Sequence, residues 1–310
     1  MKLISFLVPV YNEEDNVAPL AAKIADVMSP LSTRYDYELI FTDNRSNDRT
    51  WERIAELALK NPRMRAFRFS RNFGYQRSIL TGYAKARGAC AIQLDCDFQD
   101  PPELVLQFLR HWEEGAKVVY GVRRSRQESW WMNTARSLFY RLIDSLSEDD
   151  LPHDAGDFRL VDRRAIDELL KIEDSSPYLR GTLATLGFTQ VGVPYDRGAR
   201  ERGVSKFAVS ELVGLALDGI LNHSIVPLRL ATYTGLAISV LTFLAMVGYA
   251  AGKLFFNVPM PAGWATTTAF ILLSLSVNSI FFGVIGEYLG RMYRQIKRRP
   301  LVIVDEAIER

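Results

Sequence analysis

The first 120 residues alternate short apolar runs with amphipathic segments, and this alternation limits the folds open to the chain. After the first run, apolar residues recur every three or four positions, at Val17, Leu20 and Ile24, which predicts an amphipathic helix. Strands that alternate with helices form a mostly parallel sheet covered on both faces. We therefore expect an α/β fold whose strands include residues 3–10, 37–42, 65–70, 90–94 and 117–120.

Polar clusters follow the predicted strands, at the place where parallel α/β sheets bind their ligands. That place lies beyond the carboxyl ends of the strands. The sequence contains neither a Gly-x-Gly-x-x-Gly turn nor a Walker-type loop, so a dinucleotide oxidoreductase and a P-loop NTPase are poor fits. The clusters are residues 12–15, 43–48, 71–74 and 95–100.

The last of these clusters carries two carboxylates, Asp95 and Asp97, directly after a predicted buried strand. Carboxylates at this spacing can share a hard divalent cation, and such a cation usually holds a phosphate or diphosphate. A solvated acidic turn is the alternative for this segment taken alone. The pair indicates an enzyme that acts on an activated phosphate compound.

Charge is distributed unevenly along the chain. The formal net charge of +2 gives no electrostatic case for nucleic-acid binding. Residues 230–252 and 254–286 contain no charged residue, and each stretch can supply the roughly 20 apolar residues that cross a bilayer as a helix. Basic residues gather outside the pair, so the positive-inside rule predicts cytoplasmic termini and a cytoplasmic catalytic region. We expect an integral protein of the inner membrane with two spans.

The expected organisation has four parts. Residues 1–204 form the catalytic domain, and residues 205–228 contain a helix whose narrow polar stripe suits the membrane interface. Packing of that helix against the domain is the alternative. Residues 229–290 contain the two spans, and residues 291–310 form a basic cytoplasmic tail.

Six motifs occur in an order typical of one enzyme family. They are Val8-Pro9-Val10-Tyr11-Asn12-Glu13-Glu14, Asp43, Ser70-Arg71-Asn72-Phe73-Gly74, Asp95-Cys96-Asp97-Phe98-Gln99-Asp100-Pro101-Pro102-Glu103, Gly156-Asp157-Phe158-Arg159-Leu160 and Ser205-Lys206. In this order they resemble the polyprenyl-phosphate glycosyltransferases, inverting GT-A enzymes of glycosyltransferase family 2 that include bactoprenol glucosyltransferases and dolichol-phosphate mannose synthases. The resemblance implies a GT-A domain followed by an interfacial helix and two transmembrane helices. It also implies transfer of a sugar from a nucleotide to a lipid-linked phosphate at the membrane.

The resemblance implies roles on the donor side. Asp97 would ligate Mg²⁺ or Mn²⁺, Asp95 would contact the metal or the ribose, and Asp43 would bind the nucleobase. A divalent ion there would stabilise the negative charge that develops on the departing diphosphate. The turn after the first strand would wall the nucleotide pocket with Pro9, Tyr11, Asn12 and Glu13.

On the acceptor side, Asp157 matches the catalytic base of the family. A phosphate monoester is already substantially ionised at neutral pH, since its second pKa is around 6. Asp157 could therefore instead orient the acceptor or an arginine. Arginines are needed to bring an anionic acceptor close to an anionic donor, although arginines near a membrane can also bind anionic lipid heads. The candidates for the acceptor phosphate are Arg123, Arg136, Arg200 and Lys206.

One departure from the family concerns the donor. The family commonly reads Asp-Asp-Gly-Ser after the second strand, whereas this chain reads Asp43-Asn44-Arg45-Ser46. UDP-glucose transferred to undecaprenyl phosphate is the favoured reaction, and a GDP-mannose-dependent mannose synthase is the alternative. A non-catalytic nucleotide-binding scaffold is a further alternative. The expected partners are a nucleotide-sugar, a polyprenyl phosphate, the membrane and further copies of the chain, without nucleic acid.

Overall fold

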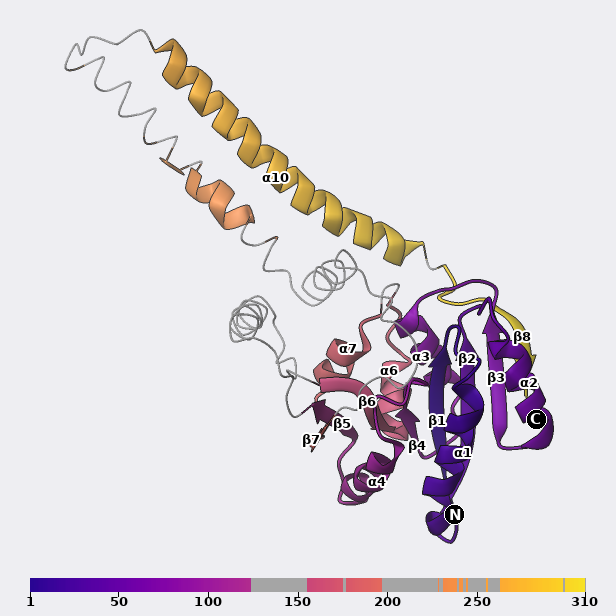
Figure 1. The fold of residues 1–310 in the computed structure, drawn as a ribbon. Helices are drawn as coiled ribbons and strands as arrows, with labels where there is room; N and C mark the ends of the chain where they lie inside the picture. Colours follow the sequence, from indigo (N-terminus) through magenta and orange to yellow (C-terminus); the bar gives the residue numbers. More distant parts are fainter. Residues whose placement is uncertain are drawn as a thin grey trace.

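A computed structural model describes residues 1–123, 155–174, 177–196, 263–297 and 299–309, together with residues 228, 231–238, 240, 241, 244 and 255 (Figure 1). Its strands are β1 (Lys2–Val10), β2 (Tyr35–Asp43), β3 (Met64–Phe69), β4 (Cys90–Gln93), β5 (Val118–Arg123), β6 (Ala155–Asp162), β7 (Gln190–Tyr195) and β8 (Val304–Ile308). Its helices are α1 (Val17–Met28), α2 (Thr50–Lys60), α3 (Tyr75–Lys85), α4 (Val105–Glu113), α6 (Arg163–Leu169), α7 (Leu179–Thr185) and α10 (Trp264–Ile296), with 3₁₀ turns at Ser29–Leu31 and Pro102–Leu104.

An eight-stranded sheet in the order β7-β5-β6-β4-β1-β2-β3-β8 forms the middle of the described domain. The pairs β1–β2, β1–β4, β2–β3 and β5–β7 are parallel. The pairs β4–β6, β5–β6 and β3–β8 are antiparallel. The predicted α/β class with a mostly parallel sheet is therefore confirmed. Because β1 to β4 run in one direction, the loops that follow them meet at one edge of the sheet.

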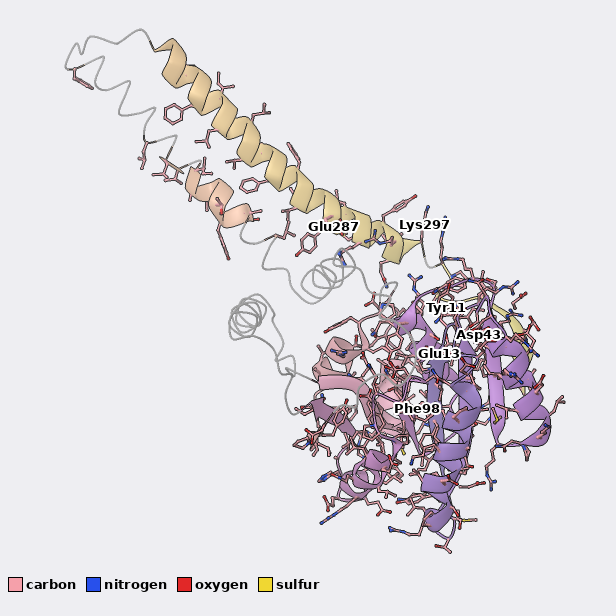
Figure 2. The ribbon with its side chains drawn as sticks, in the orientation of Figure 1. Tyr11, Glu13, Asp43, Phe98, Glu287 and Lys297 are labelled. Carbon is pink, nitrogen blue, oxygen red and sulfur yellow. The ribbon has the colours of Figure 1, made fainter. Side chains whose placement is uncertain are left out.

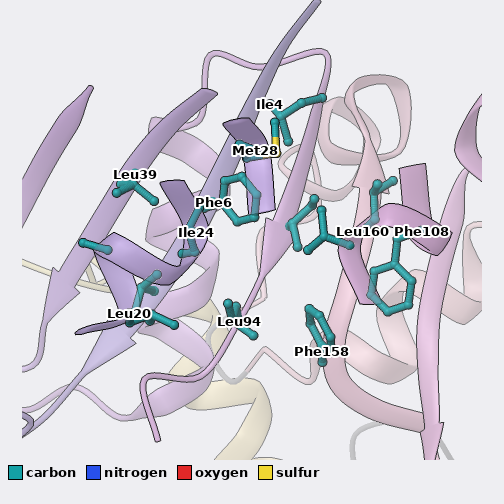
Figure 3. Packing of buried hydrophobic residues seen from close by; sticks show 14 of the residues in the cluster. Ile4, Phe6, Leu20, Ile24, Met28, Leu39, Leu94, Phe108, Phe158 and Leu160 are labelled. Carbon is teal, nitrogen blue, oxygen red and sulfur yellow. The ribbon is translucent and has the colours of Figure 1, made fainter. Parts of the chain in front are cut away.

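Apolar side chains fill both faces of this sheet. On one face, Phe6 and Leu39 belong to a cluster with helices α1, α2 and α4, part of which is drawn in Figure 3. On the other face, Leu7 and Ile40 belong to a cluster with α3, α6 and α7. Strands buried on both faces are near-continuous apolar runs, which is why these segments are so apolar in the sequence. With helices over both faces, the strand ends are the part of the sheet left for ligands.

The sequence patterns do not predict the strands β6, β7 and β8. The last of these lies in the segment expected to be a basic tail, yet it pairs with β3 in the register Arg68↔Glu306. Its acidic residues face basic partners: Glu306 Oε1 lies 3.0 Å from Arg68 Nη1, and Asp305 Oδ2 lies 2.5 Å from Arg45 Nη1. The C-terminal segment therefore covers the edge that β3 would otherwise expose.

Helix α10 extends from the domain on the side at which β1 and β2 end (Figure 1). Near its C-terminal end, the Gln295 amide donates a hydrogen bond to the backbone oxygen of Glu173. No helix in the described part of the chain has both the length and the apolar character needed to cross a membrane. The predicted interfacial helix, except for Leu228, and much of the first predicted span lie outside the described residues.

Candidate active site

Hydrogen bonds join the loop after β1 to the loop after β2. The Asn12 N–H donates to Ser46 Oγ at 2.9 Å, and the Asn47 N–H donates to Asn12 Oδ1 at 2.8 Å. The Glu13 N–H donates to Thr50 Oγ1 at 2.8 Å. Asn12 has a φ of 57°, a left-handed conformation that asparagine tolerates better than most residues. The first predicted nucleotide-binding turn is thereby fixed against the second.

The predicted nucleotide-binding residues lie together at this edge. Pro9 is buried within β1, whereas Tyr11 and Glu13 are half-buried in the turn that follows. The Tyr11 hydroxyl accepts a hydrogen bond from Asn47 Nδ2 at 3.3 Å. Figure 2 shows Tyr11, Glu13 and Asp43 at the end of the sheet nearest to α10. Their contact with a nucleotide stays a prediction.

Asp43, the last residue of β2, is fully buried, and its neighbours occupy its carboxylate. Oδ1 accepts hydrogen bonds from the Ser46 N–H at 3.0 Å and from Ser46 Oγ at 2.5 Å. Oδ2 lies 3.4 Å from Arg68 Nε. Burial raises the pKa of Asp43, while Ser46 and Arg68 act in the opposite direction. In this arrangement Asp43 holds the serine that supports Asn12.

Arg45 occupies the position at which the family motif carries glycine. Its φ of 62° explains the family's preference, because a left-handed backbone costs an L-residue roughly 1–2 kcal/mol. The Arg45 guanidinium pairs with Asp305 of β8 at 2.5 Å. Both side chains are about half exposed, so the pair offsets at most about 1 kcal/mol of that cost. Arg45, which replaces the glycine of the family motif, therefore contacts the C-terminal strand β8.

Arg68 connects the end of β2 to β8. Its Nε faces Asp43, and its Nη1 lies 3.0 Å from Glu306 Oε1. The other oxygen of Glu306 accepts a hydrogen bond from Trp51 Nε1 at 3.0 Å, and the Arg68 guanidinium lies 5.7 Å from the centre of the Trp51 ring. A residue near the C-terminus therefore positions an arginine beside the predicted nucleobase residue.

The predicted metal residue Asp95 lies two residues after the end of β4. Its Oδ1 accepts a hydrogen bond from the Tyr75 hydroxyl at 2.5 Å. Burial raises the pKa of Asp95 to about 7; the Tyr75 hydrogen bond opposes this shift, and the charges of Asp157 and Asp97 add to it. Several carboxylates are therefore gathered around Asp95. A divalent cation would favour the ionised form of such a carboxylate.

Asp97 is buried, whereas Asp95 is half-buried, and the Asp97 Oδ1 accepts a hydrogen bond from the Gln99 N–H at 3.2 Å. Within the described residues, no group of three or more His, Cys, Asp or Glu side chains could hold a metal ion. Asp95 and Asp97 supply two carboxylates, and Mg²⁺ is commonly bound by one or two carboxylates together with substrate phosphates. The residues present therefore fit a divalent ion whose remaining ligands would be supplied by a diphosphate and water.

Asp157 lies in β6 and forms a two-bonded ion pair that the sequence does not predict. Arg180 Nε donates to Oδ1 at 2.8 Å, and Arg180 Nη2 donates to Oδ2 at 2.6 Å. Arg159 Nη2 lies 3.9 Å from Oδ1 and donates to the backbone oxygen of Gly156 at 3.0 Å. The candidate catalytic base thus faces two guanidinium groups, one of which is buried.

Tyr75 and Arg180 are the site residues that sequence reasoning misses. Tyr75 directly follows the Ser70-to-Gly74 motif, and its place at the start of α3 is the signal that could have found it. Arg180 lies in α7, outside every family motif, and only the fold brings it to Asp157.

The predicted acceptor-phosphate residues are only partly visible. Arg123 is the last residue of β5. The other three candidates, Arg136, Arg200 and Lys206, lie outside the described residues.

A mostly parallel sheet with an acidic pair beyond its strand ends defines an α/β enzyme that acts on phosphate-containing substrates. A family model described as "Glycosyl transferase family 2" matches residues 5–170, more than half of the 310-residue chain. The chain belongs to glycosyltransferase family 2. The predicted family, the GT-A-like α/β fold and the predicted glycosyltransferase class are thereby confirmed.

Relatives align over almost the whole chain. The glycosyltransferase YkcC of Bacillus subtilis (strain 168) is 39% identical over 304 residues, which cover 98% of this chain and 93% of that protein. The SfII prophage-derived bactoprenol glucosyl transferase of Shigella flexneri is 32% identical over 305 residues, which cover 98% of each chain. A crystal structure of glucosyl-3-phosphoglycerate synthase from Mycobacterium tuberculosis with Mn²⁺, uridine diphosphate and phosphoglyceric acid aligns with a TM-score of 0.46 at 21% identity, covering 71% of this chain and 76% of that chain.

Proposed function

We propose that this glycosyltransferase transfers glucose from UDP-glucose to undecaprenyl phosphate, with inversion, at the cytoplasmic face of the membrane. The observation that carries the proposal is the similarity to bactoprenol glucosyl transferases over 98% of the chain. An acceptor phosphate oxygen forms a bond to the anomeric carbon while the bond from that carbon to the diphosphate oxygen breaks. The electron pair of the broken bond leaves with UDP.

The donor side follows from the edge of the sheet. The turns that contain Asn12 and Ser46 would hold the nucleoside, and their mutual hydrogen bonds organise them beforehand. A divalent ion, Mg²⁺ or Mn²⁺, held by Asp97 and Asp95 would supply positive charge to the departing diphosphate. Tyr75 keeps Asp95 in place through its 2.5 Å hydrogen bond.

The acceptor side requires positively charged protein side chains, whereas the metal site requires carboxylates. Donor and acceptor are both anionic, so cationic side chains must offset their repulsion. Arg123, Arg136, Arg200 and Lys206 are proposed for this role from the family resemblance. Asp157 lies near the start of β6, which pairs with β4 beside the end of β4 that leads to Asp95.

We further propose that the chain is an integral protein of the inner membrane with two spans and a cytoplasmic catalytic domain, and that it forms a homo-oligomer. Two stretches of sequence without charge, 230–252 and 254–286, support the spans. Large apolar side chains on α10 are more than half exposed, which indicates an apolar partner such as lipid. They include Phe270, Ile271, Leu273, Leu275 and Phe282.

The test is a donor panel with purified full-length protein in lipid nanodiscs that contain undecaprenyl phosphate. UDP-glucose, UDP-galactose, UDP-N-acetylglucosamine and GDP-mannose would be compared by transfer of radiolabelled sugar into the lipid fraction. We expect UDP-glucose to support the fastest transfer, and Asp97→Asn to support almost none. Preference for GDP-mannose would replace the donor assignment, and no transfer from any donor to the lipid would contradict the proposal.

A further inference from the structure

The ion pair between Asp157 and Arg180 uses only part of the guanidinium. The two hydrogen bonds engage Nε and Nη2, and no described hydrogen bond engages Nη1. The Arg180 side chain retains 34% of its surface exposed, compared with 20% for Asp157. One edge of the arginine is therefore held by the carboxylate while another can meet a ligand.

The backbone also fixes Arg180 beside the acidic loop. The N–H of its neighbour Leu179 donates to Gln76 Oε1 at 3.1 Å, which ties the start of α7 to the start of α3. The residue before Gln76 is Tyr75, whose hydroxyl bonds Asp95. The neighbours of Arg180 and of Tyr75 in the chain are thus bonded to each other, which holds the arginine near the predicted metal residue.

Arg180 keeps its charge in this setting. Burial alone would lower its pKa, but the charge and the hydrogen bonds of Asp157 outweigh burial and raise the pKa above that of a free arginine. A permanently charged guanidinium whose Nη1 makes no hydrogen bond to the described residues is well suited to a phosphate, which accepts two parallel N–H bonds.

The same contact makes it unfavourable for Asp157 to accept a proton from the acceptor phosphate. Both of its oxygens accept hydrogen bonds from a cation, and such bonds favour the ionised carboxylate over the protonated form that a base must become. The acceptor phosphate also has little need of a base, because its second pKa is around 6.

We propose that Arg180 binds the phosphate of the lipid acceptor and that Asp157 is a positioning residue that aims it. This inference rests on the proposed function, because the phosphate is that of the acceptor lipid. The alternative is a purely structural role, in which the ion pair only joins α7 to β6. Its loss would then lower stability and leave the kinetics of the folded enzyme unaltered.

The experiment compares Arg180→Gln, Arg180→Lys, Asp157→Asn and the double variant Asp157→Asn/Arg180→Gln in nanodiscs. The control is Arg164→Gln, an exposed arginine of α6. Transfer would be measured against undecaprenyl phosphate concentration, UDP binding by calorimetry and folding by the thermal midpoint. We expect Arg180→Gln to raise the acceptor KM by roughly 10- to 100-fold with unchanged UDP binding, because a hydrogen bond to a charged group has about that effect.

Arg180→Lys should recover part of the acceptor affinity, since it keeps the charge but loses the fork. The double variant should be no worse than Arg180→Gln, because both substitutions remove one contact. An unchanged acceptor KM in folded Arg180→Gln and Arg180→Lys would overturn the inference, as would additive losses in the double variant. Absence of lipid transfer by the wild type would instead overturn the proposed function.

Discussion

Two aspartates at the same edge of the sheet, Asp43 in β2 and Asp157 in β6, each face an arginine, and the two contacts differ in kind. Asp43 is fully buried and meets Arg68 at one distance of 3.4 Å, with Ser46 occupying its other oxygen. Asp157 is partly exposed and meets Arg180 through two bonds of 2.8 and 2.6 Å. The first contact is largely buried, with 17% of the Arg68 side chain exposed, whereas the second leaves 34% of the Arg180 side chain exposed.

The difference indicates that the two carboxylates have different roles in one site. Asp43 organises the turns that would hold the nucleoside, so its loss should first weaken folding. Asp157 organises a charged side chain, so its loss should first weaken the reaction. Substitutions at and around the two contacts, together with two pH series, can separate these two roles.

The largest effect is expected between the two contacts, at Asp97. Asp97→Asn keeps the shape of the side chain but removes the charge that would hold the divalent ion, so transfer should fall by about 1,000-fold or more. Initial rates in Mg²⁺ and in Mn²⁺ would measure the loss, and the thermal midpoint would serve as the control. Near-normal turnover with either ion would show that Asp97 does not bind the metal.

The stability contrast comes next. Asp43→Ala should lower the thermal midpoint by about 5–10 °C, because Ser46 loses its buried hydrogen-bond acceptor and Arg68 loses its buried ion-pair partner, together worth about 2–3 kcal/mol. Asp157→Ala should lower it by only about 1–3 °C, since the pair is partly exposed and solvent can replace the carboxylate. Equal midpoints for the two variants would remove the distinction between the contacts.

The pH dependence of stability tests the crowding of charge around Asp95. Its folded-state pKa of about 7 exceeds the unfolded value of about 3.9. Between these values the folded chain holds a proton that the unfolded chain has lost, so this group makes the protein more stable as pH falls from about 7 to about 4. In EDTA, the thermal midpoint of the wild type relative to Asp95→Asn should therefore rise as pH falls through this range. A constant difference would mean that Asp95 titrates normally.

The smallest effect is expected at the C-terminal strand. Glu306→Gln weakens the grip on Arg68 and should lower UDP affinity by about two- to fivefold, since exposed ion pairs are worth less than about 1 kcal/mol. Glu309→Gln is the matched control, because Glu309 pairs instead with Arg65 and Lys85. Calorimetric titration with UDP and Mn²⁺ would compare the two. Equal UDP affinities for the two variants would mean that β8 covers the sheet edge and does not affect nucleotide binding.

The sequence predicts the central strands well because each is buried on both faces and is therefore a continuous apolar run. The acidic pair is equally visible, since Asp95 and Asp97 directly follow such a run. Asp157 is found only through the family motif. Its role depends on Arg180, which is distant from it in sequence and lies in no motif.

The C-terminal strand escapes prediction for a related reason. Its residues Asp305 and Glu306 look like part of a charged tail until Arg45 and Arg68 are placed opposite them. Local patterns report burial and periodicity, whereas these ion pairs join segments more than 200 residues apart. Contacts of this range are visible only in the folded chain.

The most direct test of the role of Asp157 is the pH profile of Asp157→Asn transfer relative to the wild type, from pH 5.5 to 8.5 with saturating donor and metal. If Asp157 aims Arg180, the ratio of variant to wild-type activity should stay low and flat, because Arg180 remains charged throughout and a saturating divalent ion would favour ionised Asp95 in both proteins. If Asp157 removes a proton from the acceptor, the ratio should climb towards one as rising pH ionises the phosphate in solution. That climb would contradict the positioning role.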